Sequence, residues 1–250
     1  MNDTGQAIPL SGQEKGIQDS QPAFILHSYP FRETSLVVEI FAQNFGRLAL
    51  VARGARRPKS ALRGVLLAFQ PLLLSWSGKS ELRTLRRAEW QAGPPRLAGM
   101  ALLCGFYLNE LLLKLLPRND PHERLFNYYQ QTLLALGARS NLAAVLRRFE
   151  IGLLKELGYA LTLQHDTETG AAVKPDHYYR YVIEHGPVLA DGAQDEFRFL
   201  GKTLLDMALD DYSDPLTLQQ SKALMRLLIN HYLGDQTLHT RQLLKDLQHF

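Results

Sequence analysis

Residues 47–69 read RLALVARGARRPKSALRGVLLAF, and the interpretation of the whole chain starts from this stretch. The aliphatic runs at 47–52 and 65–69 predict two β-strands. Gly54 and Pro58 interrupt regular structure between them, so residues 53–63 are expected to form an exposed connection. This connection carries five cations and no acid: Arg53, Arg56, Arg57, Lys59 and Arg63.

A cationic loop between two strands is suited to holding a polyanion. The arginine side chain presents a planar fork to phosphate oxygens, and each neutralised phosphate releases condensed counterions. The simpler alternative is a solvated charged loop without a partner, which is the usual fate of a run of charges. The loop alone favours neither interpretation, so the charge of the surrounding sequence has to decide.

The positive charge of this chain is concentrated in one segment. The 250 residues carry a net charge of only +3. Residues 21–93 hold 11 lysines and arginines against four acids, which gives that segment a net charge of +7. The residues before and after it are slightly acidic. This asymmetry predicts an anionic partner for residues 21–93.

The sequence from Ala23 to Trp90 predicts a small β-barrel. Short runs rich in β-branched, aromatic and leucine residues alternate there with glycine, proline and asparagine. The expected strands are residues 24–27, 35–41, 47–52, 65–69, 72–76 and 81–86. So many short strands favour closure into a barrel, because closure removes aggregation-prone edges. An OB-fold is the commonest such barrel that binds nucleic acid, and an SH3-like barrel would give a similar pattern.

The hydrophobic period changes from strand to helix after the Gly-Pro-Pro at 93–95. Helices are expected near 97–115, 120–137, 140–158, 196–209, 216–233 and from 240 onward. Asp120-Pro121 and Asp214-Pro215 are expected helix starts. The predicted fold class is α+β, with a disordered leader at 1–20, a barrel at 21–93 and a helical domain at 94–250. An irregular insertion at 161–193 interrupts the helices, with a strand at 178–183 and a turn at 184–187.

The insertion holds the residues that most resemble metal ligands. His165, His177 and His185 lie there together with Asp166 and Asp176. A closed zinc site needs four ligands in tight pairs, and this spacing provides none, so we expect no bound zinc.

Nothing in the sequence predicts an enzyme. The motifs His-Glu-x-x-His and Gly-x-Ser-x-Gly are absent, so we expect no catalytic residues, no cofactor and no small-molecule substrate. Cys104 is the single cysteine and is expected in the core, which suits a reducing cytoplasm. No run of about 18 apolar residues occurs, so no membrane span is expected.

Several phrases of the sequence together resemble the RecO family of bacterial recombination mediators. They are Ile25-Leu-His-Ser-Tyr-Pro, Glu33-Thr-Ser-Leu, Gly46-Arg-Leu, Val51-Ala-Arg-Gly-Ala-Arg, Gln70-Pro-Leu-Leu-Leu, Leu82-Arg-Thr-Leu-Arg-Arg-Ala-Glu, Tyr107-Leu-Asn-Glu-Leu-Leu, Leu146-Arg-Arg-Phe-Glu and Leu157-Gly-Tyr. No single phrase is diagnostic, and the resemblance rests on their order and spacing. It covers residues 22–160 well and the later helices loosely.

The resemblance implies an N-terminal OB-fold, a helical domain, binding to single- and double-stranded DNA, and strand annealing. It also implies cooperation with RecR in loading RecA onto strands coated by single-stranded DNA-binding protein (SSB), in the cytoplasm at the nucleoid. Many members carry a four-cysteine zinc site after the Leu-Gly-Tyr phrase, and this chain has no cysteine there. The insertion is therefore interpreted as a zinc-less remnant of a zinc-ribbon region. The expected DNA path comprises the five loop cations with Arg47, Arg83, Arg86 and Arg87.

A second site is expected on the helix that contains residues 146–150. Leu142, Leu146 and Phe149 form its buried stripe, and Arg147 and Arg148 flank that stripe. The resemblance supplies a fitting ligand, the acidic C-terminal tail of SSB, which ends in Pro-Phe. We expect Arg147 to pair with the terminal carboxylate, with Arg148 as the second candidate and Leu146 against the phenyl ring. The alternative is that both arginines only tie helices to nearby acids.

Two other functions remain open from the sequence. The charge pattern also suits an RNA-binding OB-fold protein of translation or RNA processing. A purely structural helical protein with an incidental barrel is the third possibility.

Overall fold

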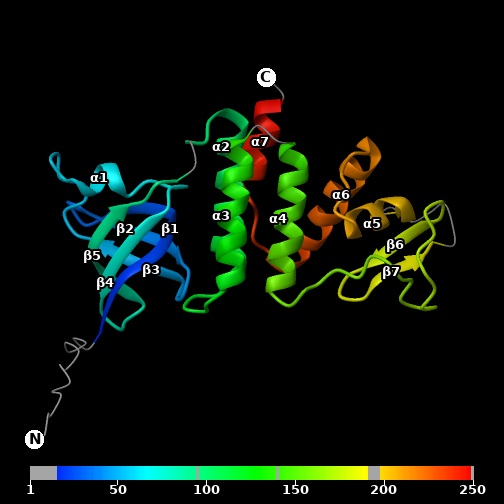
Figure 1. Cartoon of the computed structure of the whole chain (residues 1–250), viewed down its shortest axis with the longest axis horizontal. Helices are drawn as coiled ribbons and strands as arrows, with labels where there is room; N and C mark the ends of the chain where they lie inside the picture. The colour runs from blue at the N-terminus through cyan, green and yellow to red at the C-terminus, as the bar shows by residue number, and fades with distance from the viewer. Residues whose placement is uncertain (1–15, 94–95, 139–140, 191–197, 249–250) are drawn as a thin grey trace, which may run out of the picture.

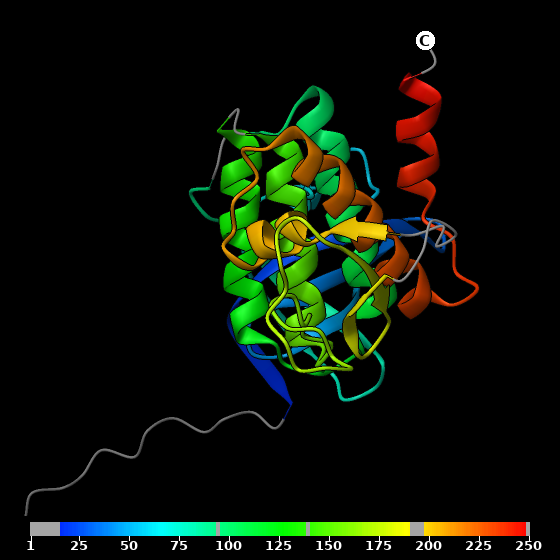
Figure 2. The same ribbon diagram turned by 90° about the vertical axis from the view of Figure 1, so that its right-hand side faces the viewer.

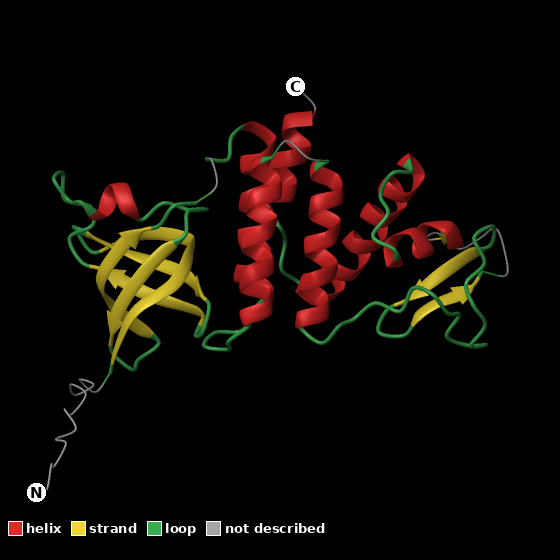
Figure 3. Ribbon diagram, viewed as in Figure 1, coloured by secondary structure: helices red, strands yellow, loops and turns green. Residues whose placement is uncertain are grey.

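The computed structural model describes residues 16–93, 96–138, 141–190 and 198–248, although side chains beyond residue 243 are not described. Figure 1 shows three parts in a row: a barrel, a group of upright helices and a small sheet with its own helices. Figure 3 shows that the strands lie at the two ends and the long helices between them.

The barrel contains β1 (Ile17–Phe31), β2 (Ser35–Ala42), β3 (Gly46–Ala52), β4 (Leu72–Ser77) and β5 (Leu82–Trp90), with the short helix α1 (Leu62–Val65) between β3 and β4. The strands close in the order β1-β2-β3-β5-β4, and β1 pairs with both β2 and β4. All neighbours are antiparallel except β3 and β5. A five-stranded closed barrel with this order is an OB-fold, as the sequence predicted.

The long strand β1 contains a run of consecutive apolar residues. Ala23, Phe24, Ile25 and Leu26 are all buried, although side chains of a strand alternate between its two faces. Ile25 belongs to the cluster inside the barrel, whereas Phe24 and Leu26 belong to a second cluster shared with the helices. Both faces of this strand are therefore covered, and the helical domain packs directly on the barrel wall.

The segment predicted as a strand at 65–69 is not one. Leu62–Val65 forms α1, and only Ala68 makes an isolated bridge, to Ile25. Phe69 has a φ of 66°, which a strand residue does not adopt, and its ring packs edge-on against Phe106 at 5.1 Å between centroids. Contact with the helical domain thus draws this segment away from the sheet.

The helical domain begins with α2 (Gly99–Leu115), α3 (Glu123–Gly137) and α4 (Leu142–Glu156). The predicted start of α3 at Asp120 is wrong, because His122 occupies the N-cap position. The backbone of residues 118–120 is held by β3 instead: Asn119 N donates to Arg47 O at 2.8 Å. Gly46 has a φ of +66°, and a Cβ there would lie 1.9 Å from Asp120 O, so only glycine permits this approach.

The predicted starts of α4 and of a later helix differ in outcome. Ser140, the expected first residue of α4, lies outside the described residues, and Asn141 is the N-cap, accepting from the amides of Ala143 and Ala144. The Asp214-Pro215 start is confirmed, since Asp214 accepts from Leu216 N and Pro215 is the first residue of α6.

The insertion forms a small antiparallel sheet. It contains β6 (Tyr178–Val182), β7 (Gly186–Leu189) and β8 (Arg198–Leu200), followed by α5 (Gly201–Ala208), α6 (Pro215–Leu233) and α7 (His239–Gln248). The predicted strand and turn at 178–187 are confirmed as β6 and its connection to β7. The predicted helix at 196–209 begins later, because residues 198–200 pair with β6; residues 196 and 197 lie outside the described part. Figure 2 shows α7 projecting beyond the other helices.

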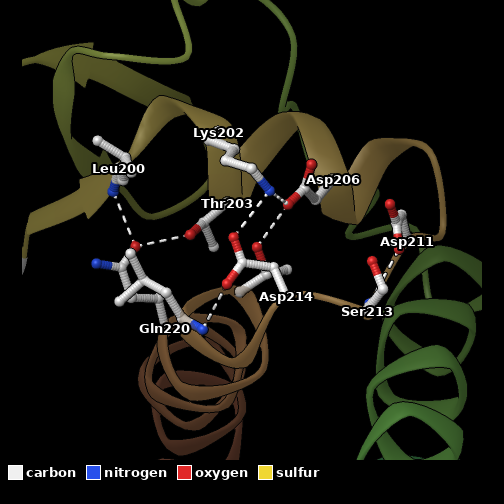
Figure 4. A network of polar contacts seen from close by, with 10 residues as sticks. Leu200, Lys202, Thr203, Asp206, Asp211, Ser213, Asp214 and Gln220 are labelled. Atoms are coloured by element: carbon white, nitrogen blue, oxygen red, sulfur yellow. Dashed lines mark hydrogen bonds and ion pairs between the residues drawn. The ribbon is translucent and has the colours of Figure 1, made fainter.

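A polar network joins α5 to the start of α6, as Figure 4 shows. Lys202 pairs with Asp206 at 2.5 Å and with Asp214 at 2.9 Å. Gln220 accepts from Thr203 Oγ1 at 2.8 Å and from Leu200 N at 2.9 Å. The network thus holds the start of α6 against α5.

The leader prediction is tested only at its end. Residues 1–15 lie outside the described residues, and residues 17–20 belong to β1 rather than to a leader. Among the described residues, none of the helices combines the length and the hydropathy that a membrane span requires.

Candidate nucleic-acid interface

The parallel pairing of β3 and β5 places several cationic segments at one end of the barrel. Because these two strands run in the same direction, the loop that follows β3 and the later residues of β5 extend toward the same end. The turn between β1 and β2 lies there too, since Arg56 N donates to Thr34 O at 2.9 Å. We call this end, formed by residues 32–34, 53–63 and 86–90, the basic end.

The loop 53–63 is anchored by its backbone and leaves its charges in solvent. Arg56 donates from its Nη1 to the carbonyl oxygens of Arg32 and Glu33, both at 3.3 Å, so this arginine also ties the loop to the β1–β2 turn. The other four cations, Arg53, Arg57, Lys59 and Arg63, are exposed. Among the described residues, no acid forms an ion pair with any of the five cations of this loop.

Arg86 and Arg87 are two further cations on β5. Both side chains are exposed. Arg86 Nε donates to Ser77 Oγ at 2.7 Å, and Arg87 pairs with Glu89 two residues away. An exposed pair of this kind is worth about 0.2–1 kcal/mol, so it leaves Arg87 available to a phosphate.

Arg47 and Arg83, which the sequence assigned to the same path, face the helical domain. Arg47 Nε donates to Leu116 O at 2.9 Å, and its Nη1 lies 3.6 Å from buried Glu39. Burial first, and then the neighbouring charge of Arg118, lower the pKa of Arg47, while Glu39 opposes both. Arg83 donates to Asn119 Oδ1 at 2.7 Å. These contacts make both residues links between the barrel and the helical domain.

A second candidate site lies among the helices. A cleft of about 280 Å³ opens between α2, α4, α6 and α7, and we call it the helical cleft. Its lining residues are Met100, Cys104, Tyr107, Leu142, Ala143, Leu146, Arg147, Lys222, Arg226 and Arg241. The floor is largely apolar and the lining holds four cations without an acid. Such a cleft suits an anionic ligand that also carries an apolar group.

Arg147 lies at the inner wall of the helical cleft and is itself buried, with 6% of its surface exposed. Its Nη2 pairs with Glu150, whose Oε1 also accepts from the Tyr107 hydroxyl at 2.7 Å. Burial lowers the pKa of Arg147, but the charge and hydrogen bond of Glu150, together with Tyr107 and Tyr212, outweigh burial and raise the pKa. Arg147 Nε and Glu150 Oε2 have no hydrogen-bond partner within the described chain.

Arg148 points elsewhere. Its Nε donates to both carboxylate oxygens of Asp210, at 2.7 and 2.9 Å, and its guanidinium lies 5.6 Å from the Tyr212 ring centroid. Arg148 therefore joins α4 to the connection between α5 and α6. Of the three residues expected at this site, the structure brings Arg147 and Leu146 into the cleft and leaves Arg148 outside it.

Three cations of the helical cleft were not among the site residues predicted from the sequence. Lys222 and Arg226 are spaced i, i+4 on α6 and so share a face, a signal that was present in the sequence. Arg241 on α7 donates from Nη1 to Asn230 Oδ1 at 2.6 Å and has its guanidinium 5.8 Å from the Tyr107 ring centroid. Only tertiary contact brings α7 to this place.

The acids and histidines of the insertion do not converge. In the described part of the chain, no group of three or more His, Cys, Asp or Glu is placed to hold a metal ion. Asp166 instead accepts four hydrogen bonds, from Glu168 N, Thr169 N, Thr169 Oγ1 and Leu189 N, at 2.7 to 3.0 Å. These bonds, led by that of the Thr169 amide, lower the pKa of Asp166 despite its burial.

Replacing Asp166 by alanine is expected to destabilise the insertion by about 1.5–3 kcal/mol, because buried donors lose a charged acceptor. The Leu189 amide should then exchange its hydrogen faster. Since folding lowers the pKa of Asp166, its contribution is complete above the ordinary pKa of 3.8 and is lost as the pH falls through the lower folded value. Hydrogen exchange at neutral pH measures the effect. Exposed Glu168→Ala is the control, and unchanged exchange in Asp166→Ala would contradict the role.

The fold and the basic end define a class of protein, an OB-fold with a basic surface and an appended helical domain. Comparison with known proteins specifies it further. Residues 18–93 match the family model "Recombination protein O N terminal", and residues 96–242 match "Recombination protein O C terminal". The chain therefore belongs to the RecO family of DNA repair proteins.

Individual RecO proteins are similar to this chain over most of its length. The DNA repair protein RecO of Nitrosospira multiformis is 60% identical over 237 residues, covering 94% of this chain and 98% of that protein. The DNA repair proteins RecO of Dechloromonas aromatica and Azoarcus sp. are 56% and 57% identical, each covering 92% of this chain and 96% of the relative.

Proposed function

We propose that this protein is a non-enzymatic DNA-binding and strand-annealing adaptor of recombinational repair in the cytoplasm, acting at the nucleoid. The observation that carries the proposal is the basic end, where anchored loop backbone holds exposed cations that have no acidic partner among the described residues. Membership of a DNA repair family favours DNA over the RNA-binding alternative.

Annealing requires that two strands approach while their bases stay free to pair. Mobile arginine and lysine side chains lower the repulsion between phosphates without occupying base edges. The loop between β3 and α1 meets this need, because its backbone is held at Arg56 while the neighbouring side chains extend into solvent. Both single- and double-stranded DNA offer the phosphates that such a surface binds.

The helical cleft is the proposed site for the acidic C-terminal tail of SSB. The apolar floor around Leu142 and Leu146 would receive the terminal phenyl ring, while Arg147 would bind the terminal carboxylate. Lys222, Arg226 and Arg241 would then neutralise the acids that precede the ring. In this proposal the protein binds SSB-coated strands through the cleft, anneals them through the basic end, and cooperates with RecR to load RecA.

Strand annealing with and without SSB tests the two sites separately. The double variant Lys222→Ala/Arg226→Ala is expected to anneal bare complementary DNA normally and SSB-coated strands slowly. Each exposed ion pair is worth about 0.2–1 kcal/mol, so the tail peptide should bind about 2- to 30-fold more weakly. Annealing is followed with strands labelled for energy transfer, and binding with a fluorescent tail peptide.

The matched control is Arg124→Ala/Lys155→Ala, which removes two exposed cations of the helical domain that do not line the cleft. It should behave like the parent in both assays. Equal slowing of bare and coated strands by the Lys222/Arg226 variant would place DNA, rather than the tail, on the cleft. Faster annealing of RNA than of DNA by the parent protein would favour the RNA-binding alternative.

A further inference from the structure

Two stacked tyrosines stand on the surface of the helical domain, outside both sites described above. The rings of Tyr159 and Tyr232 have centroids 4.0 Å apart and an interplanar angle of 22°. Tyr159 keeps 43% of its surface exposed. The pair forms a wall between two cavities of about 370 and 290 Å³, since both rings line each of them.

We call these two cavities together the tyrosine groove. Besides the tyrosines, the larger cavity is lined by residues 158, 160, 161, 181, 184, 185 and 228, and the smaller by residues 114, 115, 117, 120, 122, 156 and 157. The groove thus runs from the segment between α2 and α3 to the turn between β6 and β7. It shares no lining residue with the basic end or the helical cleft.

The charges of the tyrosine groove are mainly negative. Glu184 lies in one cavity with His185, and Asp120 and Glu156 lie in the other with His122, whose Nε2 is 3.3 Å from Asp120 Oδ2. Among the described residues, Glu184 forms one long ion pair, with His231 at 4.0 Å. After burial, the charge of Glu184 raises the pKa of Tyr232. The one lysine of the lining, Lys114, is already engaged by Glu110 at 3.3 Å and by Thr237 O.

Three helix ends add to this negative potential. The last residues of α2, α4 and α6 all contribute to the lining, through Leu115, Glu156 and Tyr232. The last carbonyl groups of a helix lack intrahelical partners, and the macrodipole places about half a negative charge at this end. A phosphate backbone is repelled by such a surface, whereas a cation is attracted to it.

We infer that the tyrosine groove binds an extended, arginine-bearing segment of a partner protein. The face of an exposed tyrosine attracts a guanidinium by cation–π interaction, and a carboxylate on either side of the pair supplies the charged hydrogen bond. Two cavities separated by one aromatic wall accept two basic side chains on either side of it. The groove acts apart from the DNA site, so the protein binds this partner and DNA together.

A short peptide of defined charge tests the inference on the full-length protein. The probe is acetyl-Gly-Arg-Gly-Arg-Gly-amide, and its control is the same peptide with citrulline, which keeps the shape and hydrogen bonds of arginine without its charge. Amide NMR spectra of the labelled protein are recorded during the titration. The arginine peptide is expected to shift the signals of Gly158, Tyr159, His185 and Tyr232, and the citrulline peptide is not.

Single substitutions then locate the contact. Tyr159→Ala and Glu184→Gln, both at exposed positions, should each lower the affinity of the protein for the arginine peptide by about 3- to 10-fold. Glu168→Gln removes an exposed acid of the same insertion outside the groove and should change nothing. Equal binding of the citrulline peptide, or shifts confined to other residues, would overturn the inference.

Two further outcomes would also overturn it. Shifts of the same signals by a DNA oligonucleotide would assign the groove to nucleic acid. Shifts that grow with protein concentration without peptide would assign it to a second copy of the chain. Because the peptide titration needs no strand annealing, failure here leaves the proposed annealing function untouched, and failure of annealing leaves the groove untouched.

Discussion

Replacing Arg53, Arg57 and Lys59 together with alanine is expected to weaken binding of single-stranded DNA about 100-fold at 0.1 M salt. Each cation that meets one phosphate contributes about 0.7 to the slope of log affinity against log salt for single strands and about 0.9 for duplex. The plot should therefore become about two units shallower for single strands and nearly three for duplex. Filter binding or fluorescence anisotropy across a salt series measures both.

Within the described part of the chain, these three side chains form no hydrogen bond or ion pair that holds the loop. Arg56 is kept, since it binds the carbonyl oxygens of the β1–β2 turn and its loss would disturb the loop itself. The matched control removes three exposed cations of the helical domain, Arg124, Lys155 and Lys174, and changes the net charge equally. An unchanged slope in the folded loop variant would mean that these charges are only solvated. An equal change in the control would mean that the effect depends on net charge alone.

Replacing Arg147 with alanine is expected to have the largest effect on stability. The substitution leaves Glu150 charged and buried without its partner, and breaking a buried ion pair in this way costs about 3–5 kcal/mol. Chemical denaturation should show the loss directly. The same variant should bind the acidic SSB tail peptide about 10- to 150-fold more weakly, because a charge-assisted hydrogen bond is worth about 1.5–3 kcal/mol.

A second variant separates the two roles of Arg147. In Arg147→Met/Glu150→Gln both charges are removed, and the glutamine carbonyl can still accept from the Tyr107 hydroxyl. Replacing a buried pair by neutral residues of similar volume is often neutral for stability. We therefore expect recovered stability without recovered peptide binding. If this variant binds the tail peptide as well as the parent protein, Arg147 only neutralises the buried charge of Glu150 and the carboxylate binds elsewhere.

The fold class could be predicted because its signals are local. Strand runs, turn residues and a change of period at 93–95 are properties of short segments, and they led to the barrel and the helices. For two segments the predicted structure was wrong, and the reason is the same for both. The runs at 65–69 and at 120–123 have the composition of a strand and a helix start, but contact between the barrel and helical domain holds both in other conformations.

The candidate sites show the same division at the level of single side chains. The five loop cations follow one another in sequence, so their surface was visible without a structure. Arg47 and Arg83 have the same charge, but Leu116 and Asn119, far away in the sequence, draw them toward the helices. The helical cleft is formed by α2, α4, α6 and α7. Its cations Lys222, Arg226 and Arg241 lie far from Arg147 in the sequence, so nothing in the sequence indicates that the four belong to one site.

The sequence by itself determined the barrel, the helical domain, the family resemblance and the basic loop, because hydrophobic period and charge density are read within a few residues. Tertiary structure alone decided which cations face solvent, which are buried against acids, and where helix ends meet. Those outcomes depend on how groups distant in the chain share hydrogen bonds and exclude water. The hydrogen bond from Tyr107 on α2 to Glu150 on α4, and the wall formed by Tyr159 and Tyr232, exist only after the helices have packed.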